Sequence, residues 1–522
     1  MHMYFIDIYC DKGDFMEINR HICTQLGETA QSISQITLDD DYIVRDNKPD
    51  VIRIIYSRGD ILIEDIKNSN QGIWISGKLR FSSLYQSDDE NHRLDSVNGE
   101  VPFQEKIVMD ELTDEDEVTV DMRIEDLSVG ILNSRKLVIR AVVNVTAKAL
   151  TESDAAISCS ISDFGYEQKT TTLPVLCLVE TEKELLHLQK ELLLPNSRSN
   201  IGQLTFYQVD FRNEEIILIE DTAQLKLDAQ IWVLYRSEST GEYECYETTV
   251  PLSSEIDVNT LHGDELFWAK IKSLESNLEP RSDYDGENRM LGLDLTLSME
   301  LQIYREENCQ LLQDAYTLDK ELVIERESLP IHQLLMKNVS KIRLMEQEQL
   351  EPNQQRILQI CGSSGNISID RIQKRENGLH VEGILNVHIL YNTTDDAMPF
   401  AYTSSQIPFE QFIEIHDFSE NSYYWIKDTI EQLQVNLLDS SEYEVKATLQ
   451  IAVLAVQREY WSNITEIIEE ELDMDTLQRQ PGMIGYVRQE GEDLWDVAKK
   501  YHATTDNMIE IGNKVLIIKQ VH

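Results

Sequence analysis

The chain contains 522 residues, with 46 Lys and Arg against 94 Asp and Glu, so its formal net charge is −48. This surplus of carboxylates disfavours a surface for nucleic acid or anionic membranes, because polyanions attract basic patches and repel acidic ones. The hydrophobic fraction of 41% is sufficient for folded cores, and the length predicts three or four domains of about 150 residues each.

The sequence offers no targeting segment, and its cysteines are scattered. No run approaches the roughly 18 uninterrupted apolar residues of a membrane helix, and residues 1–10 lack the basic region and cleavage site of a signal peptide. The seven cysteines form no C-x-x-C pair and stand at Cys10, Cys23, Cys159, Cys177, Cys245, Cys309 and Cys361. We therefore expect reduced cysteines in a cytosolic compartment, and neither a disulfide framework nor a zinc site.

An internal repeat organises most of the chain. Three runs of alternating apolar and polar residues end in Tyr85, Tyr235 and Tyr391. A proline stands 16 or 17 residues after each tyrosine, directly preceded by an aliphatic residue. Further matching runs lie upstream and downstream of each copy. Alternation at period two is typical of half-buried antiparallel strands, so the repeats predict three tandem β-rich, sandwich-like domains in a mainly β protein.

In chain order, we expect a dispensable N-terminal extension at residues 1–15, because it matches nothing in the other repeats. The three β-rich domains are expected at 16–165, 166–327 and 328–473. Within them, the segments 180–194 and 329–343 are ambiguous between helix and strand, since their apolar spacing is mixed. A polar linker at 474–482 ends in a Pro-Gly pair and leads to a small α+β domain at 483–522.

No motif in the chain predicts catalysis. Residues 72–78 fit G-x4-G-K, but Leu79 stands where a nucleotide-bound magnesium ion requires a hydroxyl, so we interpret this run as a hairpin strand. The acidic runs 110–117 and 466–471 could hold paired catalytic carboxylates or calcium, but a solvated acidic face is favoured in so acidic a chain. With no H-E-x-x-H or G-x-S-x-G motif, we expect no enzyme, no catalytic or metal-binding residue and no cofactor.

The last 40 residues have a different pattern. After Tyr486 come a Gly-Glu-Asp turn at 491–493 and a run with apolar residues at 494, 497, 498 and 501, which predicts a strand followed by an amphipathic helix. Residues 514–518 predict a closing strand. This module resembles a LysM domain, whose pattern has the same tyrosine, glycine and acid, leucine and tryptophan, and final aliphatic strand. The segment before the last strand, 510–513, is unusually short, which disfavours peptidoglycan binding.

Repeats and module together make the chain resemble the SipL-like spore coat morphogenetic proteins of clostridial spore formers, with three SPOCS domains and a terminal LysM domain. The resemblance rests on residues 38–42, 48–54, 101–103 and 133–137 of the first repeat, and the second repeat departs from it at 196–201. It implies a non-enzymatic scaffold of coat assembly in the mother-cell cytoplasm, at the forespore surface. There the LysM domain would dock a coat-basement ATPase (SpoIVA-like), and the scaffold would meet other coat proteins. The alternative is a peptidoglycan-binding protein of the wall or cortex, targeted by its LysM domain.

The expected binding residues all lie in this module. Trp495 is open to two interpretations, as the core aromatic of a small domain or as an exposed anchor for a partner. The residues expected to bind a protein partner are Leu494, Trp495, Ala498, Met508 and Ile509. The candidate glycan contacts are Gly491, Glu492 and Asp493.

Overall fold

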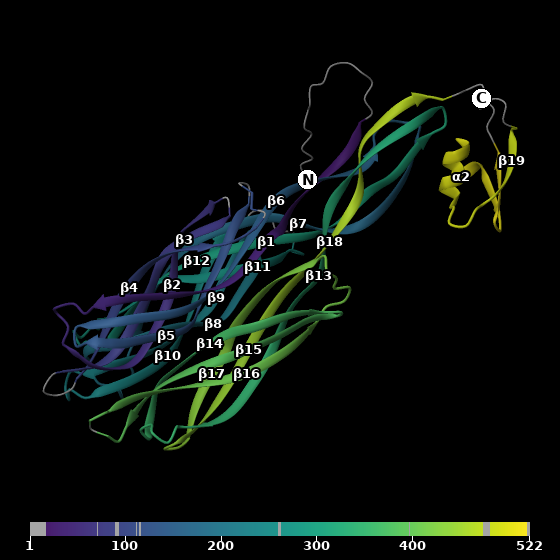
Figure 1. Cartoon of the computed structure of the whole chain (residues 1–522). Helices are drawn as coiled ribbons and strands as arrows, with labels where there is room; N and C mark the ends of the chain where they lie inside the picture. Colours follow the sequence, from purple (N-terminus) through teal and green to yellow (C-terminus); the bar gives the residue numbers. More distant parts are fainter. Residues whose placement is uncertain are drawn as a thin grey trace.

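The computed structural model confirms a mainly β chain and describes residues 17–69, 71–88, 93–110, 112–113, 116–258, 263–395, 397–472 and 481–518. Three sandwiches lie side by side, and a narrower extension carries the C-terminal module at its far end (Figure 1). The expected N-terminal extension, 1–15, and most of the expected linker, 474–482, lie outside the described residues. No helix in the described part of the chain is long and apolar enough to span a membrane.

The first sandwich consists of two three-stranded antiparallel sheets. Its strands are β1 (Ile18–Ile43), β2 (Val51–Ser69), β3 (Gly72–Ser87), β4 (Leu94–Ile107), β5 (Glu117–Asn133) and β6 (Lys136–Ile161). One sheet has the order β1-β6-β5 and the other is the meander β2-β3-β4. The first and last strands of the unit are therefore partners in one sheet.

The second and third sandwiches repeat this strand order. The second is built from β7 (Tyr166–Leu193), β8 (Ile201–Ile219), β9 (Thr222–Ser237), β10 (Tyr243–Asp257), β11 (Leu266–Arg281) and β12 (Met290–Thr317). The third is built from β13 (Lys320–Gln349), β14 (Ile357–Arg375), β15 (Gly378–Thr393), β16 (Phe400–Glu414), β17 (Ser422–Asp439) and β18 (Glu442–Glu471). In both units the first strand again pairs with the sixth.

Three sequence expectations are resolved by these strands. The ambiguous segments 180–194 and 329–343 lie in β7 and β13, apart from Leu194, which directly follows β7. The expected domain boundary between 327 and 328 falls inside β13, because the chain turns back already at residues 318–319. The G-x4-G-K run lies in β3, which confirms the hairpin strand.

The alternation seen in the sequence produces the cores. In the central strand β6, every second residue from Leu137 to Ala149 is fully buried, and these side chains face those of β3 and β4 in one hydrophobic cluster. Period-two burial is expected of a strand with one face against a second sheet. Within the acidic run 110–117, Asp116 departs from the expected solvated face. Its carboxylate is buried and accepts hydrogen bonds from the Thr113 and Thr29 hydroxyls.

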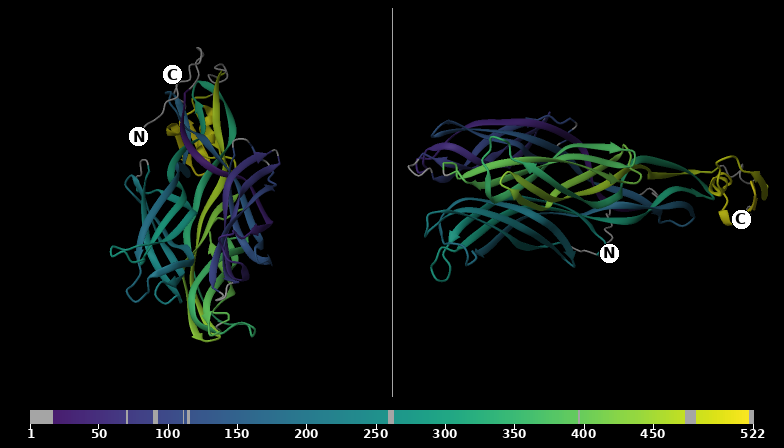
Figure 2. Two further views of the ribbon diagram at one scale, coloured as in Figure 1. Left: turned by 90° about the vertical axis from the view of Figure 1, so that its left-hand side faces the viewer. Right: turned by 90° about the horizontal axis from the view of Figure 1, so that it is seen from below.

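The three sandwiches lie against one another (Figure 2) and share a central aromatic cluster contributed by all three units. Trp232 of the second unit is 2% exposed and stacks on Phe206, while Tyr56 of the first unit contacts both rings. Gly362 of the third unit lies against the indole, and a Cβ atom there would stand 2.6 Å from the ring. The packing of three units around one indole therefore requires glycine at this position.

Beyond the sandwiches, the outer ends of β1 and β6, of β7 and β12, and of β13 and β18 continue as three two-stranded antiparallel ribbons that pack on one another (Figure 1). We call this extension the stalk and define it by residues 18–28, 150–161, 166–178, 304–317, 320–332 and 456–471. Ile157, Leu311 and Ile464, one from each ribbon pair, are fully buried inside it. The stalk thus has its own apolar core, which joins the three units at one end of the sandwiches.

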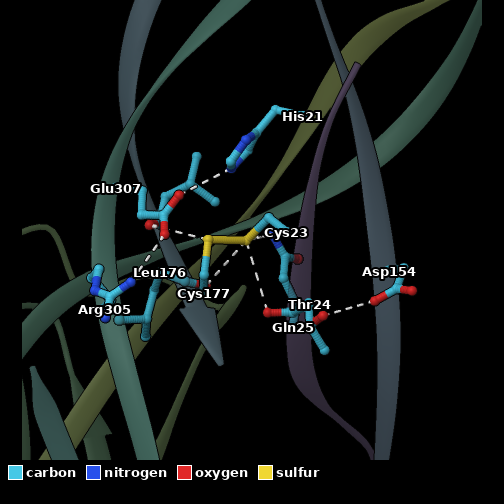
Figure 3. The surroundings of a disulfide bond; sticks show 10 residues. His21, Cys23, Thr24, Gln25, Asp154, Leu176, Cys177, Arg305 and Glu307 are labelled. Carbon is cyan, nitrogen blue, oxygen red and sulfur yellow. Dashed lines mark hydrogen bonds and ion pairs between the residues drawn. A yellow bond between two sulfur atoms is a disulfide. The ribbon is translucent and has the colours of Figure 1, made fainter. Parts of the chain in front are cut away.

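One cross-link in the stalk corrects the sequence analysis. Cys23 of β1 and Cys177 of β7 form a disulfide between the first and second units, with their Cα atoms 5.4 Å apart (Figure 3). The expectation of reduced cysteines is wrong for this pair, because 154 residues separate the two positions in the sequence and only the packing of the ribbons brings them together. Cys159, Cys245, Cys309 and Cys361 carry free thiols.

Candidate protein-docking site

The C-terminal module is a three-stranded sheet with one short helix. Its elements are β19 (Met483–Val487), α2 (Leu494–Tyr501), the 3-10 turn η1 (Thr505–Asn507), β20 (Met508–Ile511) and β21 (Lys514–Ile518). The sheet order is β19-β21-β20. The sequence analysis missed β20 as a strand. It forms because the tight turn at Gly512, with φ of 67°, folds residues 508–511 back onto β21.

Helix α2 is defined by local signals. The Asp493 carboxylate accepts a hydrogen bond from the Asp496 backbone N–H, the Asp496 carboxylate accepts one from the Asp493 N–H, and His502 ends the helix in a left-handed conformation. This reciprocal capping satisfies backbone groups that a helix end leaves free. The buried side of the helix places Val497 and Ala498 against the sheet.

Most of the expected partner-binding residues belong to the interior of the module. Ala498 is fully buried, and Leu494 and Met508 are half-buried and pack on the module's core. Trp495 is not part of that core cluster, so its interpretation as the core aromatic of the module is wrong. Ile509 lies on the opposite, open side of the sheet and is 47% exposed. The five residues therefore do not form one surface.

Trp495 is held by the stalk of the same chain. Its indole Nε1–H donates to the Asp314 carboxylate at 2.9 Å, and its ring packs edge-on against Tyr316 with centroids 4.8 Å apart. Lys499 donates to the other oxygen of Asp314 at 2.7 Å. The pairing of β12 with β7 shifts register between Leu312 and Asp314, and such an irregularity redirects side chains at the end of a ribbon.

Further contacts surround this anchor. Lys169 donates to the Asp493 carboxylate at 2.6 Å, and this hydrogen bond raises the pKa of Lys169 and lowers the pKa of Asp493. The Tyr316 hydroxyl donates to the Ala503 carbonyl at 2.8 Å, and burial raises the pKa of Tyr316. The His502 ring adds contacts with the Thr317 carbonyl at 3.0 Å and the Glu321 carboxylate at 3.5 Å. The contact thus combines an aromatic pair, hydrogen bonds and ion pairs, which is typical of a specific but limited interface.

The expected glycan contacts serve the local fold. Gly491 has φ of 91° in the turn before the helix. The Glu492 carboxylate accepts from the Tyr486 hydroxyl at 2.9 Å and from the Gln489 backbone N–H at 2.8 Å, and the backbone bond leads in lowering the pKa of Glu492. Because Asp493 caps the helix and pairs with the stalk, all three residues already have structural roles.

The outer face of the module's sheet is apolar and exposed. Paired strand residues share a face, and the pairs Met483 with Ile518 and Ile509 with Leu516 lie on the side away from the helix. The exposed large apolar side chains on this side, which we call the open face, are Met483, Val487, Ile509, Ile511 and Ile518. Apolar residues at alternating positions in both β20 and β21 were a signal for this face that the sequence analysis did not use.

Two regions of the chain match the family model described as SipL, SPOCS domain: residues 50–132 and residues 356–438. Each region runs from just before the second strand of a sandwich to its fifth strand, in the first and third units respectively. No curated protein and no solved structure matches the chain. The matched regions make the chain similar to SipL-type sporulation proteins over these two units.

Proposed function

We propose that this chain is a non-enzymatic scaffold of spore coat assembly that docks its partner through the open face of the C-terminal module. The observation that carries the proposal is the position of the module, which lies at the end of the stalk farthest from the three sandwiches (Figures 1 and 2). One side of the module is anchored by Trp495, so the opposite side is presented outward.

The partner in this proposal is a coat-basement ATPase (SpoIVA-like) at the forespore surface, in the mother-cell cytoplasm, with other coat proteins bound by the sandwiches. The match to SPOCS regions supports a role in sporulation. The open face suits a protein partner because apolar anchors contribute most of the binding energy of an interface.

A double substitution on the open face tests the proposal. Ile509→Glu with Ile511→Glu places two charges in the patch and should weaken capture of the purified ATPase by the full-length chain at least tenfold. Both side chains are exposed, at 47% and 70%, so the fold should survive, which circular dichroism checks. Tyr284→Glu, which changes an exposed side chain of the second sandwich, is the matched control and should bind as the wild type does.

Peptidoglycan binding is the competing outcome. Purified glycan strands in a parallel sedimentation assay should not retain the full-length chain, because Gly491, Glu492 and Asp493 are engaged in the turn, the cap and the contact with Lys169. Undiminished ATPase capture by the double variant would overturn the docking site. Retention by glycan with no ATPase capture would overturn the function itself.

A further inference from the structure

The disulfide between the first and second units lies beside two other metal-binding side chains. His21, two residues before Cys23 on the same face of β1, points towards Glu307 of β12, and its Nε2 atom lies 3.0 Å from the Glu307 carboxylate (Figure 3). The ligand atoms of His21, Cys177 and Glu307 all lie within 4.8 Å of one another, and Cys23 is bonded to Cys177. Three ligand groups from three strands thus converge, and Cys23 is bonded to one of them.

The donor set of this cluster is that of a zinc ion. Two thiolates, one imidazole and one carboxylate match the sulfur, nitrogen and oxygen ligands that zinc takes in tetrahedral sites. Two thiolates on one zinc lie about 3.8 Å apart, so the sulfur atoms must separate from their bonded position, which rotation of the two side chains accomplishes. The ligand atoms of His21, Cys177 and Glu307 already lie within 4.8 Å of one another.

The surroundings suit a bound metal ion. Two thiolates, one carboxylate and Zn²⁺ together carry one negative charge. The Arg305 guanidinium lies 3.8 Å from the Glu307 carboxylate and shares its positive charge between Glu307 and Glu265, to which it donates at 2.6 Å. The buried Gln25 side chain donates to the Cys23 sulfur at 3.9 Å, as outer hydrogen-bond donors do around metal-bound sulfur. The cysteines are 2% and 6% exposed, whereas the His21 and Glu307 side chains are 40% and 32% exposed, which leaves a route for the ion.

We propose that His21, Cys23, Cys177 and Glu307 bind one Zn²⁺ ion when the disulfide is reduced. A dithiol reductant supplies two electrons and two protons, becomes a disulfide itself and leaves two thiols in the protein. Zinc then displaces both thiol protons to solvent and binds the two sulfur atoms, the imidazole nitrogen and the carboxylate. The first and second units are therefore cross-linked in both states, by a disulfide under oxidising conditions and by zinc under reducing conditions.

The test measures metal content of the full-length chain. The protein is reduced with a phosphine, loaded with zinc chloride, dialysed and analysed for zinc, with the oxidised protein as the parallel sample. The reduced chain should retain one zinc per molecule and the oxidised chain none. Cobalt(II) added to the reduced chain should give the visible absorption of a tetrahedral site with sulfur ligands, which needs no variant and reports on coordination directly.

Substitutions assign the ligands. Cys23→Ser and Cys177→Ser should abolish zinc retention. His21→Ala and Glu307→Gln should each weaken zinc binding more than about 100-fold, because losing a residue that only supports a ligand already costs roughly 10- to 100-fold in affinity. Cys309→Ser, which changes a free thiol in the same stalk cluster, is the matched control and should keep the zinc. Equal zinc content in the reduced wild type and the Cys23→Ser variant would overturn the proposal, as would loss of zinc in the control.

Discussion

The contact between the C-terminal module and the stalk depends on Trp495, and Trp495→Ala should release the module. The substitution removes a hydrogen bond to the charged Asp314 carboxylate, worth about 1.5–3 kcal/mol. It also removes the edge-on contact with Tyr316, worth about 0.5–1.5 kcal/mol. The combined loss of about 2–4.5 kcal/mol lowers the ratio of docked to undocked molecules by about 30- to 2,000-fold. The module itself should stay folded, because Trp495 is outside its core cluster.

Nuclear magnetic resonance of the ¹⁵N-labelled full-length chain measures this release. A docked module tumbles with the whole chain and gives broad amide signals, whereas an undocked module of about 40 residues tumbles faster and gives sharp ones. Lys499→Ala is the matched control on the same helix: it removes only a partly exposed ion pair to Asp314, worth under about 1 kcal/mol, and should leave most modules docked. Equally sharp module signals in the wild type and in Trp495→Ala would refute the reasoning.

Three further predictions concern the body of the protein. Gly362→Ala should lower the free energy of unfolding by about 1–3 kcal/mol in chemical denaturation, because the new methyl group meets the Trp232 ring. Burial lowers the pKa of His332 to about 4; the folded state therefore keeps this ring neutral while the unfolded chain protonates it, and stability should fall by up to about 3 kcal/mol between pH 6.5 and pH 4. A hydrogen bond that the Cys245 thiol donates to Cys361, followed by burial, raises the pKa of Cys245, so iodoacetamide at pH 8 should label it far more slowly in the native than in the unfolded protein.

Each of these predictions has a result that contradicts it. Gly27→Ala makes the same change at a strand position where the nearest atoms lie at an ordinary 3.4 Å, and it should be nearly neutral; an equal loss at both glycines would argue against the indole clash. His332→Gln should flatten the loss of stability in acid, and an unchanged slope would assign that loss to other groups. Rapid native labelling of Cys245 would contradict its burial beside a second thiol.

Local patterns in the sequence were sufficient for the architecture of each unit. Alternation from Leu137 to Ala149 predicts a strand with one buried face, and the structure places those residues in the core of a sandwich. The same argument applies to the capped helix of the C-terminal module, where Asp493 and Asp496 act within one turn. Such signals are readable because the interacting groups lie a few residues apart in the chain.

Mixed spacing was less informative. The segments 180–194 and 329–343 could not be assigned from the sequence, because their leucines suit either a helix or a strand. The structure resolves both as parts of strands that extend from a sandwich into the stalk. In the first segment, Leu186 and Leu194 are buried in the core of the second sandwich. In the second segment, Leu329 and Ile331 pack in the stalk whereas Ile342 packs in the third sandwich, so burial along this strand does not follow the pattern of a single sandwich strand.

The contacts between units were decided only by the tertiary structure. Cys23 and Cys177 are 154 residues apart, and Trp495 reaches Asp314 across 181 positions. The alternation of apolar and polar residues shows which side of a strand is buried. Because all three units share this alternation, it does not determine which ribbon packs against which other ribbon. The sequence by itself therefore determined three β units and a small capped module, whereas the disulfide, the zinc ligands proposed around it and the open face of the module depend on how those units pack together.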